Sequence, residues 1–558
     1  MEKIWLKHYP EGVKAEIDLN QFKSISDVFF HSCKKYANLP AFYNLGKTIS
    51  FKETEQMVLH FASFLRNHLK LEPGERVAIM MPNVLQYPIA LFGTLCAGLV
   101  VVNVNPLYTP RELEHQLKDS GATTIIVLEN FANNLEQILE HTDIKNVVLT
   151  NVGDLLGTLK GSFINFTLKH IKKVIPNHRL KEKAIFFKNA LYLGSNKDFT
   201  PTELNHNHLA FLQYTGGTTG VAKAAMLSHG NMVANMLQAY EWINGDLQDG
   251  HEVVVTALPL YHVFSLTANL LTFVKTGGKN VLITNPRDIA GFIEELKKHK
   301  ITVLTGVNTL FNALVNHPNF KTVDFSTWKY ALGGGMAVQQ AVAESWKKIT
   351  GIPICEAYGL TETSPAACIN LLNMEDHTGG IGLPISSTEV SIRDDMGNEL
   401  PIGQSGELFI KGPQVMQGYW GYPEETAKVL GKDGFLATGD IGVMDQNGFI
   451  KLVDRKKDMI VVSGFNVYPN ELEDVIASHP KVLEVACIGV PSEKTGEAIR
   501  VFIVPQSPDL TKEEIINFCK ERLTAYKVPK DIIFKDDLPK SNVGKILRRS
   551  LRDEPTNK

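Results

Sequence analysis

Short apolar runs alternate with helical patterns of apolar and polar residues through most of the chain. The runs are rich in Val, Ile and Leu, as is typical of strands that are buried on both faces of a sheet. They cover residues 77–81, 122–129, 146–150, 252–258, 279–284 and 301–307. The alternation of such strands with helices predicts an α/β protein built in layers.

A different pattern occupies residues 388–412, where two segments of alternating polarity flank an Asp-Met-Gly-Asn turn and a Pro-Ile-Gly turn. Alternation with a period of two, interrupted by turn residues, is typical of antiparallel strands. We therefore expect a β-rich subdomain at this point of a large multi-layered domain.

The chain after the charged string DRKKD, residues 454–458, has the pattern of a separate small domain. One helix is expected to bury Leu472, Val475 and Ile476, and strands are expected at residues 482–490 and 498–504. We predict a large N-terminal domain, residues 1–453, and a small α+β C-terminal domain, residues 454–558.

Composition excludes several classes of protein. The chain has 558 residues, of which 44% are hydrophobic and 21% are charged, as in globular proteins of more than one domain. A formal net charge of -3 gives no general attraction to nucleic acid. The first residues, MEKIWLKHYP, lack the apolar core of a secretory signal, so we expect a cytoplasmic protein. The six cysteines form no CxxC pair, and neither a disulfide framework nor a zinc cluster is expected.

The segment YTGGTTGVAK contains the first candidate for chemistry. Its glycines allow close approach of the backbone to a ligand, its hydroxyls can donate hydrogen bonds, and its lysine supplies a point charge. This set of groups suits a polyphosphate, although a polar surface turn is the alternative. The spacing is not that of a Walker A loop, which disfavours a P-loop kinase or ATPase. The loop residues are Thr215, Gly216, Gly217, Thr218, Thr219, Gly220 and Lys223.

Further candidates stand downstream in EAYGLTETSP, residues 356–365. Tyr358 could stack on an adenine ring, Thr361 could bond a phosphate, and Glu362 could hold Mg²⁺ as a hard oxygen ligand. GFLATGD, VDRKKD and LPKSNVGK follow, and they contribute Asp440, Arg455 and Lys545.

In this order, the segments closely resemble the motif series of the adenylate-forming (acyl-adenylate/luciferase) superfamily. The closest resemblance is to bacterial long-chain fatty acid CoA ligases, and it covers essentially the whole chain, including LPLYHVF, TGVNTLFNAL, GGGM and DRKKDMIVVSGFNVYPNELEDV. It implies an enzyme that uses ATP and Mg²⁺ to ligate a long-chain fatty acid to CoA through an acyl-adenylate, releasing AMP and pyrophosphate.

The resemblance also implies roles for single residues. Residues 215–223 would bind the β- and γ-phosphates, Asp440 and Arg455 the ribose hydroxyls, and Thr361 and Glu362 the phosphates and metal. Lys545 looks like the family's catalytic lysine, and His262 lies where the family places a residue near the acyl carboxylate. The residues that would form the adenine pocket are Gly333, Gly334, Gly335, Glu356, Ala357, Tyr358 and Gly359.

The family's small domain is mobile, because the CoA thiol must reach the adenylate from a side that this domain first covers. Lys457 sits at the hinge position, and Gly464, Phe465 and Asn466 would then face the thioester site. A charged linker without an active role is the alternative for Lys457. A packed histidine is the alternative for His262.

One departure from the family stands directly after the loop lysine, where this chain has Ala224 in place of the usual glycine. A β-carbon is harmless there if the residue leaves the loop in a strand, but it weakens phosphate binding if it approaches the nucleotide closely.

Two surfaces for apolar partners are expected. Residues 263–271 and 307–314 are candidates for the lining of an acyl tunnel, with ordinary core packing as the alternative. Residues 155–181 contain no acidic residue and several lysines, and Ile164, Leu168, Ile171 and Ile175 fall near helical spacing. This segment predicts peripheral contact with the anionic cytoplasmic face of the membrane; a solvated helix packed on its own domain is the alternative.

Two other functions stay open at this point. An acyl-AMP ligase would load a carrier protein, and a non-catalytic protein would bind or transport fatty acid. The combination of Lys223, Glu362, Asp440 and Lys545 disfavours the non-catalytic protein. A homodimer is compatible with the sequence, which identifies no symmetric interface.

Overall fold

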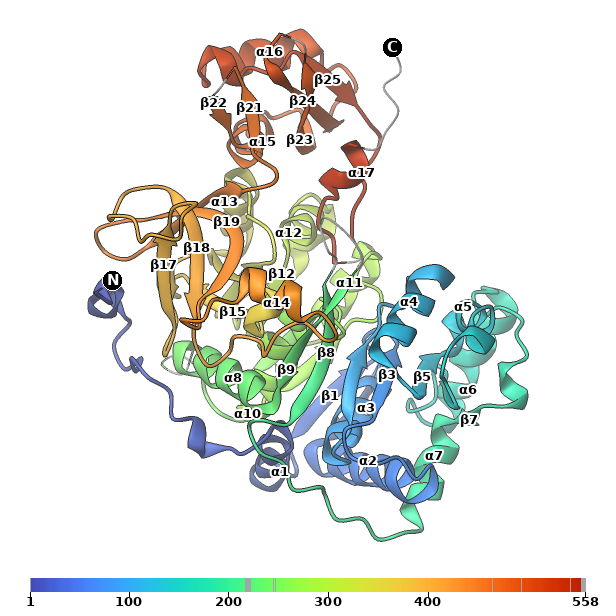
Figure 1. Cartoon of the computed structure of the whole chain (residues 1–558). Coiled ribbons are helices and arrows are strands. Elements are labelled where there is room, and N and C mark those ends of the chain that lie inside the picture. The colour runs from blue at the N-terminus through green and yellow to red at the C-terminus, as the bar shows by residue number, and fades with distance from the viewer. Residues whose placement is uncertain are drawn as a thin grey trace.

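The computed structural model describes residues 2–215, 222–243, 245, 247–463, 465–492, 494–541 and 543–552. Over these residues the chain forms a large body on which a smaller domain, made of the last strands and helices, stands (Figure 1). None of the helices in the described part of the chain combines the length and apolarity that a membrane crossing requires.

The first large sheet has seven strands, which are parallel except for the antiparallel hairpin at one edge. Three of its strands coincide with apolar runs of the sequence. In spatial order the strands are β7 (Ile185–Phe186), β6 (Asn146–Thr150), β5 (Thr124–Leu128), β3 (Arg76–Met80), β4 (Val100–Asn103), β8 (Leu209–Thr215) and β9 (Lys223–Ser228).

The second large sheet has nine strands, with a parallel centre and antiparallel strands at both ends. In spatial order they are β16 (Leu383–Pro384), β15 (Ala366–Ile369), β14 (Ile354–Gly359), β13 (Tyr330–Gly334), β12 (Val303–Gly306), β10 (Val253–Thr256), β11 (Lys279–Leu282), β1 (Pro40–Asn44) and β2 (Lys47–Ser50). Most of these strands are buried, as the continuous apolar runs require.

Helices cover both sheets because alternate residues of a strand point to opposite faces. Val77 and Ile79 of β3 belong to the central core, together with α3 (Gln86–Cys96). Ala78 of the same strand belongs to an outer core with Leu113 of α4 (Pro110–Ser120). Every residue of α3 is buried, as expected for a helix enclosed on all sides. The predicted layered α/β architecture is confirmed.

The other helices of the body follow the same plan. Their bounds are α1 (Ile25–Lys35), α2 (Phe51–Ser63), α5 (Ala132–Glu136), α6 (Thr158–Phe166), α7 (Phe187–Ser195), α8 (His229–Ile243), α9 (Val263–Ser265), η8 (Leu266–Leu271), α10 (Thr272–Lys275), α11 (Ile289–Leu296), α12 (Asn308–Val315) and α13 (Gln340–Thr350). Helix α8 belongs with α3 to the central core, whereas α11, α12 and α13 pack on the outer face of the nine-stranded sheet.

The expected β-rich subdomain is a four-stranded antiparallel sheet. Its strands are β17 (Glu389–Arg393), β18 (Gly406–Lys411), β19 (Leu436–Met444) and β20 (Ile450–Arg455), and α14 (Pro423–Val429) lies between β18 and β19 in the chain. Strand β20 leads directly into the small domain.

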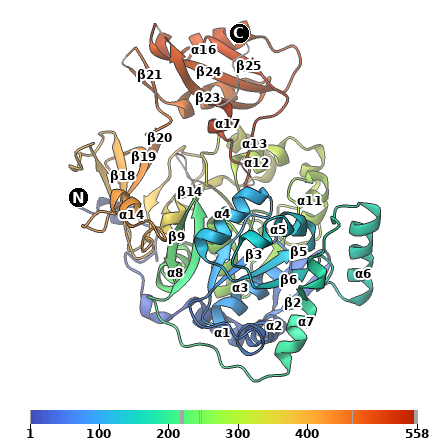
Figure 2. The ribbon, with the colours of Figure 1, turned by 45° about the vertical axis from the view of Figure 1, so that its right-hand side comes forward.

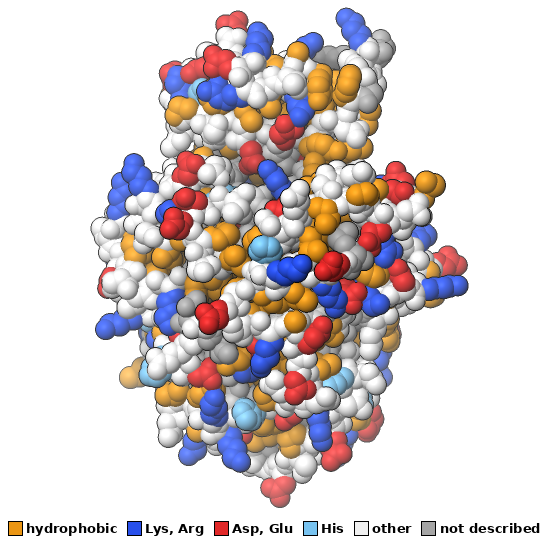
Figure 3. Space-filling model, turned by 90° about the vertical axis from the view of Figure 1, so that its left-hand side faces the viewer, with side chains coloured by type: hydrophobic (Ala, Val, Ile, Leu, Met, Phe, Trp, Pro, Cys, Tyr) orange, Lys and Arg blue, Asp and Glu red, His pale blue; other side chains and the backbone are white. Residues whose placement is uncertain are grey.

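The small domain has a five-stranded sheet with three described α-helices, as the α+β prediction requires. Its elements are β21 (Ile460–Val462), β22 (Phe465–Val467), α15 (Pro469–Ala477), β23 (Val482–Ser492), β24 (Gly496–Pro505), α16 (Lys512–Lys520), β25 (Asp531–Phe534) and the terminal α17 (Arg548–Arg552). Leu472 and Ile476 are fully buried and Val475 is half-buried. Figure 3 shows this domain above a narrowed waist, with acidic and basic side chains interspersed over the visible face.

Candidate active site

A cleft of about 1640 Å³ lies between the large body, the β-rich subdomain and the small domain. Its lining includes strand ends of β8, β13, β14 and β19, together with the loop that precedes α17. A pocket for one small ligand measures roughly 300–1,000 Å³, so this cleft can hold more than one ligand at a time.

Lys545 reaches into the cleft from the small domain. The loop that carries it is held against the body, because Thr309 of α12 donates a hydrogen bond from Oγ1 to the carbonyl oxygen of Gly544 at 3.0 Å. Gly544 has a φ of +83°, and a Cβ there would lie 2.5 Å from Oγ1 of Thr309. Glycine is therefore required both by the left-handed backbone and by the close approach.

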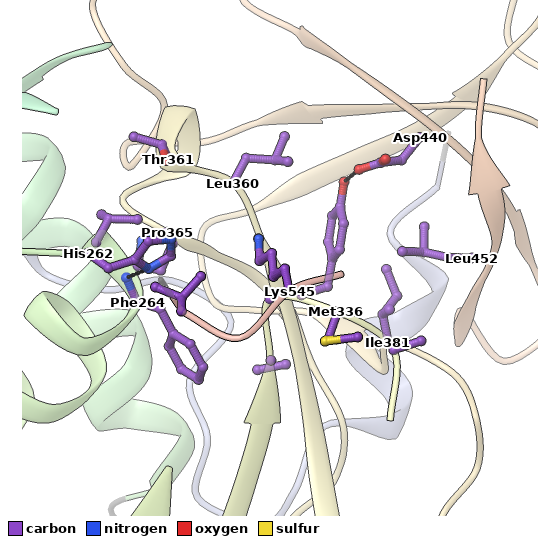
Figure 4. Close-up of a pocket in the computed structure, with 18 of the residues that line it drawn as sticks. His262, Phe264, Met336, Leu360, Thr361, Pro365, Ile381, Asp440, Leu452 and Lys545 are labelled. Atoms are coloured by element: carbon purple, nitrogen blue, oxygen red, sulfur yellow. Dashed lines mark hydrogen bonds between the residues drawn. The ribbon is translucent and has the colours of Figure 1, made fainter. Parts of the chain in front are cut away.

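The charge of Lys545 is perturbed by this position. Burial and the neighbouring Arg455 lower the pKa of its amino group to about 8, while Asp440 and Glu362 oppose the shift. Figure 4 shows its side chain lying between His262 on one side and Asp440 on the other. The amino group is thus a cation held in place by the small domain, with little water around it.

The carboxylate of Asp440 is held on both oxygens. Tyr358 donates a hydrogen bond from its hydroxyl to Oδ2 at 2.7 Å, and Nε of Arg455 lies 3.2 Å from Oδ1. Asp440 and Arg455 are opposite residues of β19 and β20, which fixes their side chains next to each other. The sequence-based candidates for one subsite therefore meet in space.

The glycine turn and the EAYG segment also lie side by side, because β13 and β14 are parallel neighbours. Gly333 is in register with Glu356, and Gly334 is in register with Ala357, while Gly359 is the last residue of β14. Glu356 accepts a hydrogen bond from the backbone NH of Val338 at 3.0 Å, and burial raises the pKa of its carboxyl to about 8. A Cβ on Gly335 would lie 3.2 Å from Cε of Lys545, so the turn leaves room for that side chain.

Thr361 and Glu362 stand on a short turn, η10 (Thr361–Thr363), that follows β14. One carboxylate oxygen of Glu362 accepts a hydrogen bond from the hydroxyl of Tyr419 at 2.7 Å. Both residues line the cleft, and Figure 4 shows Thr361 close to His262 and Lys545.

The predicted phosphate loop connects the two strands of a hairpin. Thr215 ends β8 and is paired with Lys223, which begins β9, and both line the cleft. The loop residues between them that we singled out, Gly216, Gly217, Thr218, Thr219 and Gly220, lie outside the described residues.

Ala224 is a strand residue. It pairs with Tyr214 of β8, and its side chain is buried in the outer core of the seven-stranded sheet. Its β-carbon therefore contributes to the core. Of the two possibilities that the sequence left open, the harmless one applies, because Ala224 leaves the loop in a strand.

His262 stands directly before α9. Its Nδ1 accepts a hydrogen bond from the backbone NH of Phe264 at 3.3 Å, so Nε2 carries the proton of the neutral ring. Burial, reinforced by the cation of Lys545, lowers the pKa of His262 to about 3. The ring is thus a neutral hydrogen-bond donor on the wall of the cleft.

The hinge candidate and the thioester candidates lie apart. Lys457 lines the cleft. Phe465 is 57% exposed on β22 and stacks on Tyr526, and neither Phe465 nor Asn466 is among the described residues that line the cleft. Gly464 lies outside the described residues. The small domain thus presents Lys545, and not β22, to the cleft.

Comparison with known proteins agrees with this geometry. The family of AMP-binding enzymes matches residues 29–420, and the C-terminal domain of AMP-binding enzymes matches residues 471–545. The chain belongs to the AMP-binding enzyme family.

Relatives of this AMP-binding enzyme extend over its full length. A long-chain-fatty-acid--CoA ligase of Escherichia coli O6:H1 is 54% identical over 558 residues, which is 100% of this chain and 99% of that protein. The ligase of the same name from Haemophilus influenzae is 52% identical, over 99% of both chains. The crystal structure of the anthranilate CoA ligase AuaEII in complex with anthranoyl-AMP has the same fold, with a TM-score of 0.85 at 23% identity over 96% of this chain and 98% of that one.

In this AMP-binding enzyme the cleft continues from Lys545 along the inner face of the nine-stranded sheet. Asn235, Ala239 and Ile243 line it from α8, and their spacing of four residues places them on one face of the helix. Tyr330 and Leu332 line it from β13, two residues apart on one face of the strand. Ala239 and Ile243 are only half-buried although α8 belongs to the central core, because the cavity lies beside them.

Of the two segments that we expected to line an acyl tunnel, one lines this cavity and the other mostly does not. Of the segment 263–271, Val263, Phe264, Thr267 and Ala268 line the cavity. Of the segment 307–314, the described lining contains Asn308 alone, whereas Leu310, Phe311 and Leu314 pack in the outer core. The apolar face of α12 packs into the outer core of the nine-stranded sheet, and α8 supplies the cavity wall in its place.

Sequence reasoning missed three further residues of the site. Thr309 holds the loop of Lys545, Tyr419 contacts Glu362, and Glu425 forms an ion pair with Lys223 at 2.5 Å. The sequence GYPEET does carry the signal of a helix start, with Pro at the first position and acids in the first turn. It carries no signal that this helix lies next to a lysine far away in the chain.

Proposed function

We propose that the protein ligates a long-chain fatty acid to CoA through an acyl-adenylate, consuming ATP and releasing AMP and pyrophosphate. The observation that carries this proposal is the position of Lys545 between His262 and Asp440, in a cleft that continues into an apolar cavity. Full-length identity of 54% to a long-chain-fatty-acid--CoA ligase supports the acyl and CoA assignments.

In the first half-reaction the acyl carboxylate attacks the α-phosphorus and pyrophosphate leaves. Lys545 neutralises charge that develops between the carboxylate and the α-phosphate, and it does so in a site with little water, where such a contact is strong. The neutral imidazole of His262 donates from Nε2 to an acyl oxygen. Asp440 accepts hydrogen bonds from the ribose hydroxyls, and Arg455 holds that carboxylate in place.

The nucleotide base would lie against β13 and β14. Gly335, in the turn after β13, carries no side chain, and a Cβ there would lie 3.2 Å from Cε of Lys545. Residues 215–223 would bind the β- and γ-phosphates, with Lys223 as the cation of that loop.

Mg²⁺ fits the donors that the structure provides. Glu362 offers a carboxylate whose only described hydrogen bond comes from Tyr419, and Thr361 stands beside it. No cluster of three or more His, Cys, Asp or Glu is found in the described ranges, so the ion would be shared with phosphate oxygens and water, as Mg²⁺ prefers. When bound, the metal supplies positive charge at the phosphates.

For the second half-reaction we propose that the small domain swings as a unit about a hinge at Lys457. Gly464, Phe465 and Asn466 would then replace Lys545 at the cleft. The contacts of Arg548 support a single moving unit, because it donates to Glu473 at 2.7 Å and to Asn470 at 2.6 Å. These bonds tie α17, and with it the loop of Lys545, to α15.

A pyrophosphate-release assay with a series of acids from acetate to stearate, with and without CoA, tests the proposed function. We expect release with long-chain acids, acceleration by CoA, and a thioester product. Adenylate that forms but never reacts faster with CoA would favour an acyl-AMP ligase that loads a carrier protein. Fatty acid binding without pyrophosphate release would indicate a binding protein.

We further propose that α6 and the turn after it contact an anionic lipid surface. Figure 2 shows α6 at the edge of the body, away from the small domain. Ile164 and Leu168 pack against the core, so half of the stripe expected from the sequence faces inward. Ile171 of the stripe is 65% exposed, and three further apolar side chains face solvent near it: Leu159 is 90% exposed, Phe163 68% and Phe166 56%. Exposed Lys160, Lys169, Lys172 and Lys173 surround them.

Replacing Phe163 and Phe166 by serine should reduce binding to vesicles that contain phosphatidylglycerol at least tenfold, since burying each Phe contributes about 1.5–3 kcal/mol. Met396→Ser, at an 84% exposed site on the β-rich subdomain, is the matched control and should bind as the unchanged protein does. Sedimentation of vesicles with bound protein measures the effect. Unchanged vesicle binding of the double variant would contradict the proposal. A dimer that dissociates in this variant would identify the face as a subunit interface.

A further inference from the structure

Lys223, the lysine of the proposed phosphate loop, is occupied by a carboxylate of its own chain. Its Nζ lies 2.5 Å from Oε2 of Glu425 on α14, and it also lies 5.3 Å from the ring centroid of Tyr419. An anion already stands where the proposed function requires the lysine to meet phosphate oxygens.

We propose that Glu425 is an exchangeable counter-ion of Lys223, which competes with the phosphates for this lysine and thereby promotes release of pyrophosphate. The inference rests on the proposed function, which assigns Lys223 to the β- and γ-phosphates. Glu425 is here a positioning residue, since it acts through Lys223 and not on the reacting atoms.

The backbone holds Glu425 beside the loop. Tyr419 forms a bridge with Ala225 of β9, and the NH of Trp420 donates to the carbonyl oxygen of Ala224 at 2.9 Å. The NH of Tyr419 also donates to Oγ1 of Thr426 at 2.8 Å, which fixes the first turn of α14 against the same segment. The path of the chain thus places the first turn of α14 within reach of Lys223.

A second cation makes the exchange possible. Lys428, one turn along α14, forms an ion pair with the other carboxylate oxygen of Glu425. When Lys223 moves to a phosphate oxygen, Glu425 keeps a partner and is not left as an unpaired charge. Lys223 and Glu425 are both partly exposed, 27% and 33%, so the pair contributes little net free energy and is easily exchanged.

The same geometry favours binding of ATP before the reaction and release of pyrophosphate after it. ATP is held at several subsites at once, including the adenine and ribose pockets, and can displace Glu425 from Lys223. Pyrophosphate that has been cleaved from AMP is held by the phosphate subsite alone, where Glu425 competes with it and repels it. Glu425 lowers the affinity for both ligands, but only pyrophosphate lacks further subsites that would hold it in the cleft, so the competition promotes its release.

The test is Glu425→Gln, which keeps shape and removes charge, with Glu424→Gln as the matched control on the exposed side of the same helix turn. In titration calorimetry with magnesium pyrophosphate, Glu425→Gln should bind about 3- to 10-fold more tightly, and pyrophosphate should inhibit its adenylation step more strongly. The gain should shrink at high salt, because exposed charges are screened. Glu425→Ala should act with the same sign.

Unchanged or weaker pyrophosphate binding in both Glu425 variants would overturn the inference. Lys223→Ala separates this failure from failure of the proposed function. If Lys223→Ala weakens pyrophosphate binding while the Glu425 variants leave it unchanged, Lys223 binds phosphate and only the competition is wrong. If Lys223→Ala also has no effect, the assignment of the loop fails with it.

Discussion

Replacing Lys545 by methionine should slow formation of the acyl-adenylate about 100- to 1,000-fold, which is the usual loss when one preorganised charge at a developing anion is removed. Methionine keeps the length and most of the volume of the side chain, so the small domain should still dock through Thr309 and Gly544. Rapid-quench measurement of pyrophosphate release in a single turnover reports this step directly.

The second half-reaction supplies the internal control for Lys545. Thioester formation from CoA and a supplied acyl-adenylate should proceed close to the normal rate in Lys545→Met, because Lys545 has left the cleft at that stage in the proposed swing. Lys530→Met, at an exposed lysine of the same domain, should alter neither step. Equal losses in both half-reactions would contradict a role confined to adenylation.

The pH profile gives an independent readout of the same lysine. An amino group with a lowered pKa is protonated below that value, so the cation is present at neutral pH and is lost as pH rises through about 8. The kcat/KM for ATP, which reports the free enzyme, should therefore fall above about pH 8. Arginine stays charged over this range, and the alkaline fall should be absent in Lys545→Arg, whatever its rate at neutral pH.

Replacing Ala239 by phenylalanine should abolish most activity toward stearate and leave activity toward octanoate nearly intact. Ala239 stands in the middle of the α8 face that lines the cavity, between Asn235 and Ile243. A phenyl ring there would fill the space of the acyl chain beyond this point. If about four methylenes stay in water, at ~0.8 kcal/mol each, the kcat/KM for the long acid falls about 100-fold or more.

Steady-state kinetics with saturated acids of increasing length measures this effect. The ratio of kcat/KM between octanoate and stearate is the informative quantity, since it cancels any general loss of folded protein. Ala239→Leu should give an intermediate ratio, because its side chain fills less of the space. An unchanged ratio in Ala239→Phe would mean that the acyl chain does not follow α8.

Much of the fold could be predicted because the physical cause is local. The run at residues 77–81 is apolar without interruption, and such a run is buried on both faces, as β3 is. Helix α15 likewise follows from Leu472 and Ile476 on one face. Capping follows only in part from local sequence: Oγ1 of Thr511 accepts a hydrogen bond from the NH of Glu514 at the start of α16, whereas the carboxylate of Glu514 pairs with Lys481, which is distant in the chain.

The candidate site could be predicted in its chemistry but not in its contacts. The resemblance to adenylate-forming enzymes implies that Asp440 and Lys545 serve a nucleotide, and carboxylate chemistry makes Glu362 a candidate for the metal. Neither residue type nor spacing indicates which charged side chains form ion pairs with one another before a ligand binds. Tyr358 was expected to stack on adenine, and the structure adds that its hydroxyl also donates to Asp440.

The sequence by itself determined the layered α/β class, the β-rich subdomain, the small domain and the residues that carry the proposed chemistry, because each depends on patterns within a short stretch of chain. Tertiary structure alone decided which apolar face becomes a cavity wall and which becomes core, as α8 and α12 show. It also decided that α6 turns Phe163 outward, and that Glu425 meets Lys223. These outcomes depend on what packs opposite a residue, and the facing segment can lie anywhere in the chain.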